Sequence, residues 1–173
     1  LVGSEMCIRD SLQRVVGSSR ISLLDGFSGY NQILVHPDDQ DKTAFTTPWG
    51  TFKYVKMPFG LKNAGATFQR AMDIAFAKEI HDFLVIYLDD LTVFSKTDQQ
   101  HLDHLRQVFI KCRKYGISLN PKKSLFGLEE GKLLGHIISK DGIRIDPERI
   151  QAILQIPHPR NIKELQAFIG KIN

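Results

Sequence analysis

Short apolar runs alternate with helically spaced apolar residues along this chain. Residues 21–24 (ISLL) form an apolar run that stops at Asp25, and residues 83–95 (FLVIYLDDLTVFS) contain two apolar runs separated by Asp89 and Asp90. Runs of this length bounded by polar turn residues are typical of buried strands. We therefore expect a strand that ends at Asp25 and a strand–turn–strand unit over residues 83–95.

Two longer segments have helical spacing. Residues 63–80 begin with Asn63, a possible helix cap, and carry an apolar residue at every fourth position: Phe68, Met72, Phe76 and Ile80. Residues 98–117 predict a helix that ends at Gly116, with an apolar stripe made of Leu102, Leu105, Phe109 and Cys112. We expect His101 and His104 on a solvated polar face of this helix, because no third metal ligand accompanies them.

The remaining segments predict hairpins and two further helices. Residues 42–58 (KTAFTTPWGTFKYVKMP) look like a hairpin with its turn at Pro48-Trp49-Gly50, where Trp49 either shields the hairpin or stacks on a base. We also expect a second strand within residues 26–35, and short strands around residues 117–120 and 133–139 with a basic turn, Lys122-Lys123, between them. Helix starts are marked by two capping patterns, Asp146-Pro147 and Asn161 with Glu164. Short connections favour antiparallel pairing, so the predicted fold class is α+β.

Composition excludes several classes of protein. The 173 residues suffice for one domain and the start of a second, and no run reaches the 18 or more apolar residues of a membrane span. Two distant cysteines and no apolar leader argue against a secreted disulfide framework or a cysteine-based zinc site, so we expect an intracellular protein without a membrane partner. The net charge of +4 is compatible with a polyanionic partner.

The three aspartates at strand ends are candidates for metal binding. If the strands that end at Asp25 and Asp89 are neighbours, their carboxylates meet at one sheet edge, with Asp90 beside them. Clustered carboxylates suit Mg²⁺, and a pair of such ions supports phosphoryl or nucleotidyl transfer. The alternative is a solvated hairpin turn, and from spacing alone this is the commoner case.

Five separated segments resemble, in the same order, the palm motifs of reverse transcriptases, closest to gypsy-type LTR retrotransposons. They are LLDGFSGYNQI (23–33), KMPFGLKNAGATFQRAM (56–72), YLDD (87–90), LNPKKSLF (119–126) and LLGHIIS (133–139). The resemblance implies a polymerase palm, a ferredoxin-like antiparallel sheet backed by helices, with partial fingers. It divides the chain into residues 1–11, which we expect to be extraneous, the palm at 12–146, and the start of the thumb or connection at 147–173.

The resemblance also implies roles for individual residues. Asp25, Asp89 and Asp90 resemble the catalytic carboxylates, with the backbone carbonyl of Gly26 as a further contact to two Mg²⁺ ions, for which Mn²⁺ can substitute. The deoxynucleotide site would include an aromatic gate against ribose at Tyr30, the Phe59-Gly60 segment, and one of two lysines, Lys122 or Lys123. The open alternatives are a core tyrosine and two solvated turn lysines.

Nucleic-acid contacts and partners follow from the same resemblance. Leu133, Leu134 and Gly135 resemble the hairpin that grips the primer, and Gln69 and Arg70 lie off the apolar helix face, where they can reach the template. The expected partners are an RNA or DNA template with its primer and deoxynucleoside triphosphates. RNase H and integrase would belong to the full polyprotein, in the cytoplasm or in virus-like particles, and the sequence leaves the oligomeric state open.

Two glycines depart from the family pattern and keep a rival hypothesis open. Gly26 stands where a larger apolar residue is usual, and Gly65 where a proline is usual. The fingers region upstream of the first motif, whose basic residues grip the triphosphate, is absent from this sequence. The rival is a catalytically dead retroelement remnant that acts at most as a nucleic-acid-binding module.

Overall fold

The computed structural model describes residues 10–172. The chain divides into two compact units, one made of residues 18–129 and the other of residues 1–17 with 130–173. In the described part of the second unit, residues 10–15 are helical. None of the helices within residues 10–172 combines the length and apolar character that crossing a bilayer requires.

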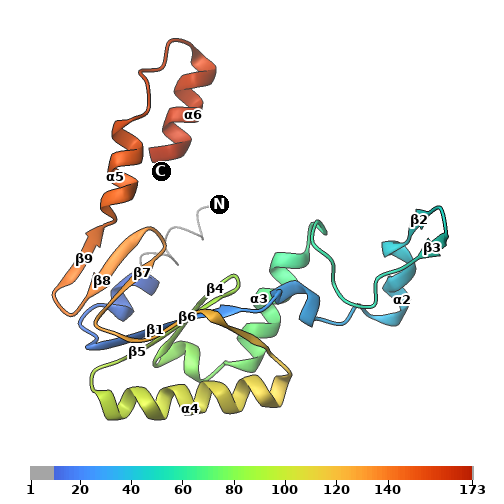
Figure 1. Cartoon of the computed structure of the whole chain (residues 1–173), viewed down its shortest axis with the longest axis horizontal. Helices are drawn as coiled ribbons and strands as arrows, with labels where there is room; N and C mark the ends of the chain where they lie inside the picture. The colour runs from blue at the N-terminus through green and yellow to red at the C-terminus, as the bar shows by residue number, and fades with distance from the viewer. Residues whose placement is uncertain (1–9, 173) are drawn as a thin grey trace. The chain divides into compact units, whose positions relative to one another are not determined.

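A four-stranded antiparallel sheet forms the centre of the first unit (Figure 1). Its strands are β1 (Arg20–Gly26), β4 (Leu84–Tyr87), β5 (Asp90–Ser95) and β6 (Leu119–Leu128), in the order β4-β5-β1-β6. The strand–turn–strand expected over residues 83–95 is the β4–β5 hairpin, in which Tyr87 pairs with Asp90. The sheet and its helices confirm the α+β class.

Two helices pack on the sheet and enclose the core. They are α3 (Ala64–Ala75) and α4 (Asp98–Tyr115). The periodicity of residues 63–80 correctly identifies the buried face of α3, although the helix is shorter than expected, Glu79–His81 forms a separate 3₁₀ turn, and the Asn63 side chain makes no capping bond. Residues from both helices and from three strands form one cluster that includes Leu24, Phe68, Met72, Leu84, Leu91, Val93 and Val108.

The buried face of α4 differs from the predicted stripe. Leu105 and Cys112 are buried as expected, and burial raises the pKa of the Cys112 thiol to about 11. Leu102 is 59% exposed and Phe109 38% exposed, while Val108 is fully buried in their place. The helix is rotated relative to the most apolar stripe.

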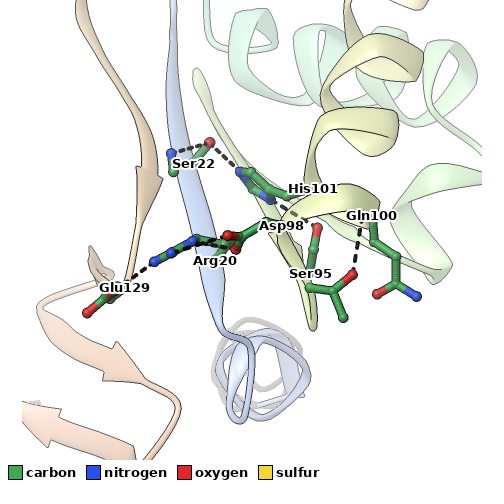
Figure 2. A network of polar contacts seen from close by, with 9 residues as sticks. Arg20, Ser22, Ser95, Asp98, Gln100, His101 and Glu129 are labelled. Carbon is green, nitrogen blue, oxygen red and sulfur yellow. Dashed lines mark hydrogen bonds and ion pairs between the residues drawn. The ribbon is translucent and has the colours of Figure 1, made fainter.

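A buried polar network is the reason for this rotation (Figure 2). His101 is only 4% exposed, so the prediction that it is solvated is wrong. Its Nε2 lies 2.7 Å from Ser22 Oγ on β1, and its Nδ1 lies 2.9 Å from Ser95 Oγ at the end of β5. His104 also reaches Ser95, with its Nδ1 2.8 Å from the hydroxyl, and its ring stacks on Phe83. The two histidines therefore dock α4 on the sheet instead of facing solvent.

The connections of the first unit contain short helices and one small hairpin. Residues 26–35 do not form the expected second strand; they contain the 3₁₀ turn Gly29–Gln32 and a single bridge from Leu34 to Lys56. Helix α2 (Pro37–Gln40) and a 3₁₀ turn (Asp41–Thr43) follow. The hairpin predicted over residues 42–58 is present as β2 (Phe45–Thr47) and β3 (Gly50–Phe52), and Trp49 at its turn is 87% exposed. Trp49 therefore shields little of the hairpin.

Strand β6 and the second unit complete the fold. Lys122 and Lys123 lie within β6 and not in a turn between strands, because register shifts let the strand bulge there and continue to Leu128. The second unit has a three-stranded sheet of β7 (Glu130–Leu133), β8 (His136–Ser139) and β9 (Gly142–Ile145). Residues 133–139 are thus a hairpin turn and one strand. Helices α5 (Pro147–Leu154) and α6 (Ile162–Ile172) begin at the predicted caps.

Candidate active site

The three aspartates come from adjacent strands at one end of the four-stranded sheet. Asp25 near the end of β1 lies opposite Asp90 at the start of β5, and Asp89 occupies the turn between β4 and β5. The backbone N–H of Gly26 donates to the carbonyl of Asp89 at 2.9 Å, so β1 is tied to the turn itself. The expectation that the strands ending at Asp25 and Asp89 are neighbours is wrong, because β5 lies between β1 and β4. The β4–β5 turn nevertheless brings Asp89 to β1.

The Asp89 carboxylate is the least well accommodated of the three. Its Oδ1 is buried and has no hydrogen-bond partner among the described residues. It lies against Gly29, where an added Cβ would fall 2.5 Å from this oxygen. Burial, and then the charge of Asp25, raise the pKa of Asp89. Ionised Asp89 therefore lacks a partner that compensates its charge.

Asp90 feels the same crowding and one opposing charge. Burial and the charges of Asp25 and Asp89 raise the pKa of Asp90, whereas Lys123 lowers it. Lys123 Nζ lies 4.0 Å from Asp25 Oδ1. Of the two candidate lysines, Lys123 is thus the one that β6 directs to the carboxylates.

The donor set fits a divalent cation in chemistry. Three carboxylates and a backbone carbonyl at one sheet edge are hard oxygen ligands of the kind that Mg²⁺ prefers, and the orphaned Oδ1 of Asp89 needs a positive partner. In their present positions, no three His, Cys, Asp or Glu side chains within residues 10–172 form a group that could hold an ion. The Asp89 carboxylate turned against Gly29 is consistent with this.

Tyr30 follows Gly29, the residue that lies against Asp89, and its ring packs among aromatic side chains. Its ring meets Phe59 at a centroid distance of 5.2 Å and Phe68 at 5.6 Å, both edge-on. Phe68 is buried in the core, whereas Phe59 is 63% exposed. A Cβ at Gly65 would lie 3.7 Å from the Tyr30 hydroxyl, which is ordinary van der Waals contact. Tyr30 is therefore half-buried, with its ring wedged between the core and the exposed Phe59-Gly60 segment.

The candidate template residues lie on the outer side of α3. Arg70 is exposed, and the Gln69 side chain donates to Asp73 Oδ1 at 3.0 Å. Lys122 is exposed on the bulge of β6.

The candidate primer-gripping residues form a tight turn in the second unit. Leu134 and Gly135 connect β7 to β8 with positive φ angles of 51° and 75°. Leu133 is 5% exposed, so it has little surface with which to contact a primer. Lys132 pairs with Asp146 and Glu148 and thereby links β7 to the start of α5.

Two polar residues near the site were missed at the level of sequence. Ser124 Oγ accepts from the backbone N–H of Asp25 at 3.2 Å and donates to the Asn120 carbonyl at 2.7 Å, so it bridges the bulge of β6 to β1. Gln32 binds backbone groups of Phe27 and Ser118. The sequence shows Ser124 and Gln32 only as polar residues inside two of the motifs, and it does not reveal which backbone groups they bind.

Comparisons with known proteins agree with this geometry. A family model described as reverse transcriptase (RNA-dependent DNA polymerase) matches residues 3–138, a range that includes part of the start we expected to be extraneous. The chain is 37% identical to the Pol polyprotein of transposon opus from Drosophila melanogaster over 94% of its length, covering 16% of that relative. It is 36% identical to that of transposon gypsy from the same species over 85% of its length, covering 14% of it. A fission yeast relative, the Tf2-3 polyprotein of Schizosaccharomyces pombe (strain 972 / ATCC 24843), is 33% identical over 96% of this chain, which spans 12% of it.

Solved structures share the fold. The foamy viral protease-reverse transcriptase in complex with double-stranded DNA superposes with a TM-score of 0.86 at 27% identity, over 95% of this chain and 29% of that one. The same enzyme with an RNA/DNA hybrid gives a TM-score of 0.80 at 28% identity, over 94% and 22%. The four-stranded sheet with its paired aspartates is thus found where the family match lies, and this chain belongs to the reverse transcriptase (RNA-dependent DNA polymerase) family.

Proposed function

We propose that this chain is the palm of an RNA-directed DNA polymerase that transfers nucleotides from deoxynucleoside triphosphates to a primer 3′-OH. The observation that carries the proposal is the juxtaposition of Asp25 and Asp90 across β1 and β5, with the unpaired Asp89 oxygen in the turn beside them. Each of the three carboxylates disfavours ionisation of the others, and bound cations would offset this cost.

The carboxylates would hold the metal ions. Asp25, Asp89 and the Gly26 carbonyl are the proposed ligands of two Mg²⁺ ions, with Asp90 contributing negative charge and Mn²⁺ as a substitute. When bound, the ions would supply Lewis-acid activation of the primer hydroxyl and neutralisation of the triphosphate charge. Because the Asp89 oxygen has no protein donor, ion binding would not have to displace a hydrogen bond from it.

Other side chains would select the nucleotide and manage its charge. The Tyr30 ring, wedged between Phe68 and Phe59, would form a wall under the sugar and exclude a 2′-hydroxyl. Lys123, which already lies near Asp25, would bind the triphosphate and protonate the departing pyrophosphate. Gly60, with φ of 95° and open space at its Cβ position, would let backbone approach the new base pair.

The proposed partners are a template with its primer and deoxynucleoside triphosphates. Support comes from the solved relatives, which are described as bound to double-stranded DNA and to an RNA/DNA hybrid. Arg70 and Gln69 would face the template strand, and the turn at Leu133, Leu134 and Gly135 the primer. Because the chain spans 12–16% of its curated relatives, we propose that RNase H and integrase belong to the same polyprotein, which would act in the cytoplasm or in virus-like particles.

The rival function, a dead remnant, rests on Gly26 and Gly65. Both residues fit the structure, since Gly26 packs against the Asp89 turn and Gly65 leaves room beside Tyr30. A chimera separates the hypotheses: residues 12–173 replace the matching segment of an active relative, and primer extension is measured on RNA and on DNA templates. The enzyme hypothesis predicts extension on both, whereas a folded chimera that binds primer–template without extending it would favour the remnant.

A further inference from the structure

The loop that carries Tyr30 is closed by a side chain, Gln32. The Gln32 amide nitrogen donates to the carbonyl of Phe27, and to that of Ser118 at 3.0 Å. Its amide oxygen accepts from the backbone N–H of Ser118 at 2.7 Å. The Gln32 amide thus pairs with both polar groups of Ser118 as a neighbouring strand would, and it fastens the start of the loop to its end.

The hydrogen bonds of Gln32 lie at the end of the β1–β6 ladder. The last pair of the ladder is Gly26 with Leu119, and the N–H of Phe27 then donates to the Ser118 carbonyl at 3.0 Å. Beyond Phe27 the chain leaves the sheet, and Ser28 adopts a positive φ of 51°. Without the Gln32 side chain, the backbone N–H of Ser118 would lose its partner. The start of the loop would keep one backbone bond, from Phe27 to Ser118, and its end would keep the bond from the Met57 N–H to the Ile33 carbonyl, but no bond would join the end to Ser118.

The closed loop contains two groups that face the candidate site. Gly29 lies against the Asp89 carboxylate, and Tyr30 is the first residue after it. Backbone bonds inside the loop connect Gln32 to this segment, since the N–H of Asn31 donates to Ser28 and that of Ile33 to the Tyr30 carbonyl. A change in how Gln32 is anchored is therefore passed directly to the backbone of Tyr30.

We propose that Gln32 is a positioning residue for sugar selection. Its amide fixes the position of the Tyr30 ring relative to the sugar of the incoming nucleotide, and this position sets the discrimination between deoxynucleotides and ribonucleotides. The inference rests on the proposed role of Tyr30. A steric wall acts through short-range repulsion, so a small displacement relieves the clash with a ribose while it leaves the deoxyribose nearly unaffected. A residue that mattered only for folding would change the use of both nucleotides alike.

The test compares incorporation of one deoxynucleotide and its ribonucleotide by the chimera described above. Gln32→Met keeps the length of the side chain and removes all three hydrogen bonds. Gln32→Glu keeps an oxygen for the Ser118 N–H but sets its second, negatively charged oxygen against the carbonyls of Phe27 and Ser118, so it also breaks the closure. Gln40→Met is the matched control, because the Gln40 amide also binds backbone, donating to the Val35 carbonyl at 3.2 Å, outside the Tyr30 loop. Tyr30→Val reports on the gate itself.

The expected result is that Gln32→Met lowers the ratio of kcat/KM for deoxynucleotide over ribonucleotide roughly tenfold to a hundredfold, mainly through better ribonucleotide use. Gln32→Glu should lower the ratio as well, and Gln40→Met should leave it unchanged. If Tyr30→Val lowers the ratio and neither Gln32 variant does, the positioning role is wrong while the gate stands. If Tyr30→Val leaves the ratio unchanged, the gate fails and the inference fails with it. Loss of folding in both Gln32 variants would likewise overturn it, in favour of a purely structural role.

Discussion

Asp25 lies directly opposite Asp90 in the antiparallel pairing of β1 with β5. This register brings two carboxylates onto neighbouring strands, and the β4–β5 turn adds Asp89 beside them. Burial and mutual repulsion raise the pKa of Asp89 and of Asp90, so the fold bears an electrostatic cost at neutral pH.

Removing the charge of Asp89 should stabilise the chain when no divalent cation is present. The pKa of Asp89 is higher in the folded state than its usual value of 3.8, so the protein loses stability as the pH rises from 3.8 through the pKa of the folded state. Above that pH the full cost of the buried charge remains. We expect Asp89→Asn to raise the Tm at pH 7 in EDTA by about 2–4 °C. The gain should shrink in excess Mg²⁺. A Tm that falls in EDTA would contradict the account of strain at this turn.

The network around His101 should make stability depend on pH. Burial, His104 and Arg20 lower the pKa of His101, with Asp98 opposing them. The unfolded chain therefore binds a proton more readily below pH 6.5, and stability falls as the pH decreases from there toward the folded pKa, by at most about 1.4 kcal/mol per pH unit. Denaturant unfolding between pH 5 and 8 measures this. His101→Gln should flatten the profile, whereas His36→Gln, which changes an exposed ring, should not.

The two unusual glycines should respond differently to a methyl group. Gly65 lies in the first turn of α3, and its added Cβ would only touch the Tyr30 hydroxyl. Gly65→Ala should therefore stabilise the chain by about 0.5–1 kcal/mol. At Gly26 a Cβ would lie 3.0 Å from the backbone oxygen of Asp89, so Gly26→Ala should cost about 1 kcal/mol or more. Denaturant midpoints of the two variants, compared side by side, decide; equal gains would contradict the packing at the Asp89 turn.

Lys123 and Lys122 should differ in function. Both side chains are exposed on the bulge of β6, and Lys123 Nζ lies 4.0 Å from Asp25 Oδ1. In the chimera, Lys123→Ala should slow single-nucleotide incorporation roughly a hundredfold if it acts as the general acid. Lys122→Ala is the matched control, with an effect of about twofold or less. The reverse order of effects would reassign the role to Lys122.

Much of the sheet edge could be predicted from sequence. Apolar runs that stop at Asp25 and Asp89 indicate two buried strands. The connection between β4 and β5 has only two residues, so these two strands must pair as a hairpin. The caps at Asp146 and at Asn161 with Glu164 were equally readable, because capping depends on residues within one turn.

What could not be predicted depends on partners distant in sequence. The pattern of its own helix predicts His101 as a surface residue, but its ring nitrogens reach Ser95 and also Ser22, which is 79 positions away. The segment Pro121-Lys122-Lys123 has the composition of a turn, yet pairing with β1 carries the strand through it. The hydrogen bonds of Gln32 likewise depend on Ser118, which is 86 positions away and which no local pattern connects to it.

The most direct test of the central claim is single-turnover primer extension by the chimera and by its Asp89→Asn variant, together with the Kd for primer–template. Asp82→Asn, at an exposed position before β4, serves as the matched control. If Asp89 belongs to the catalytic centre, extension in Mg²⁺ is lost in Asp89→Asn while the Kd and the Asp82→Asn rates stay within about twofold of the parent. Extension by Asp89→Asn at a rate near that of the parent would contradict the assignment of this sheet edge as the active site.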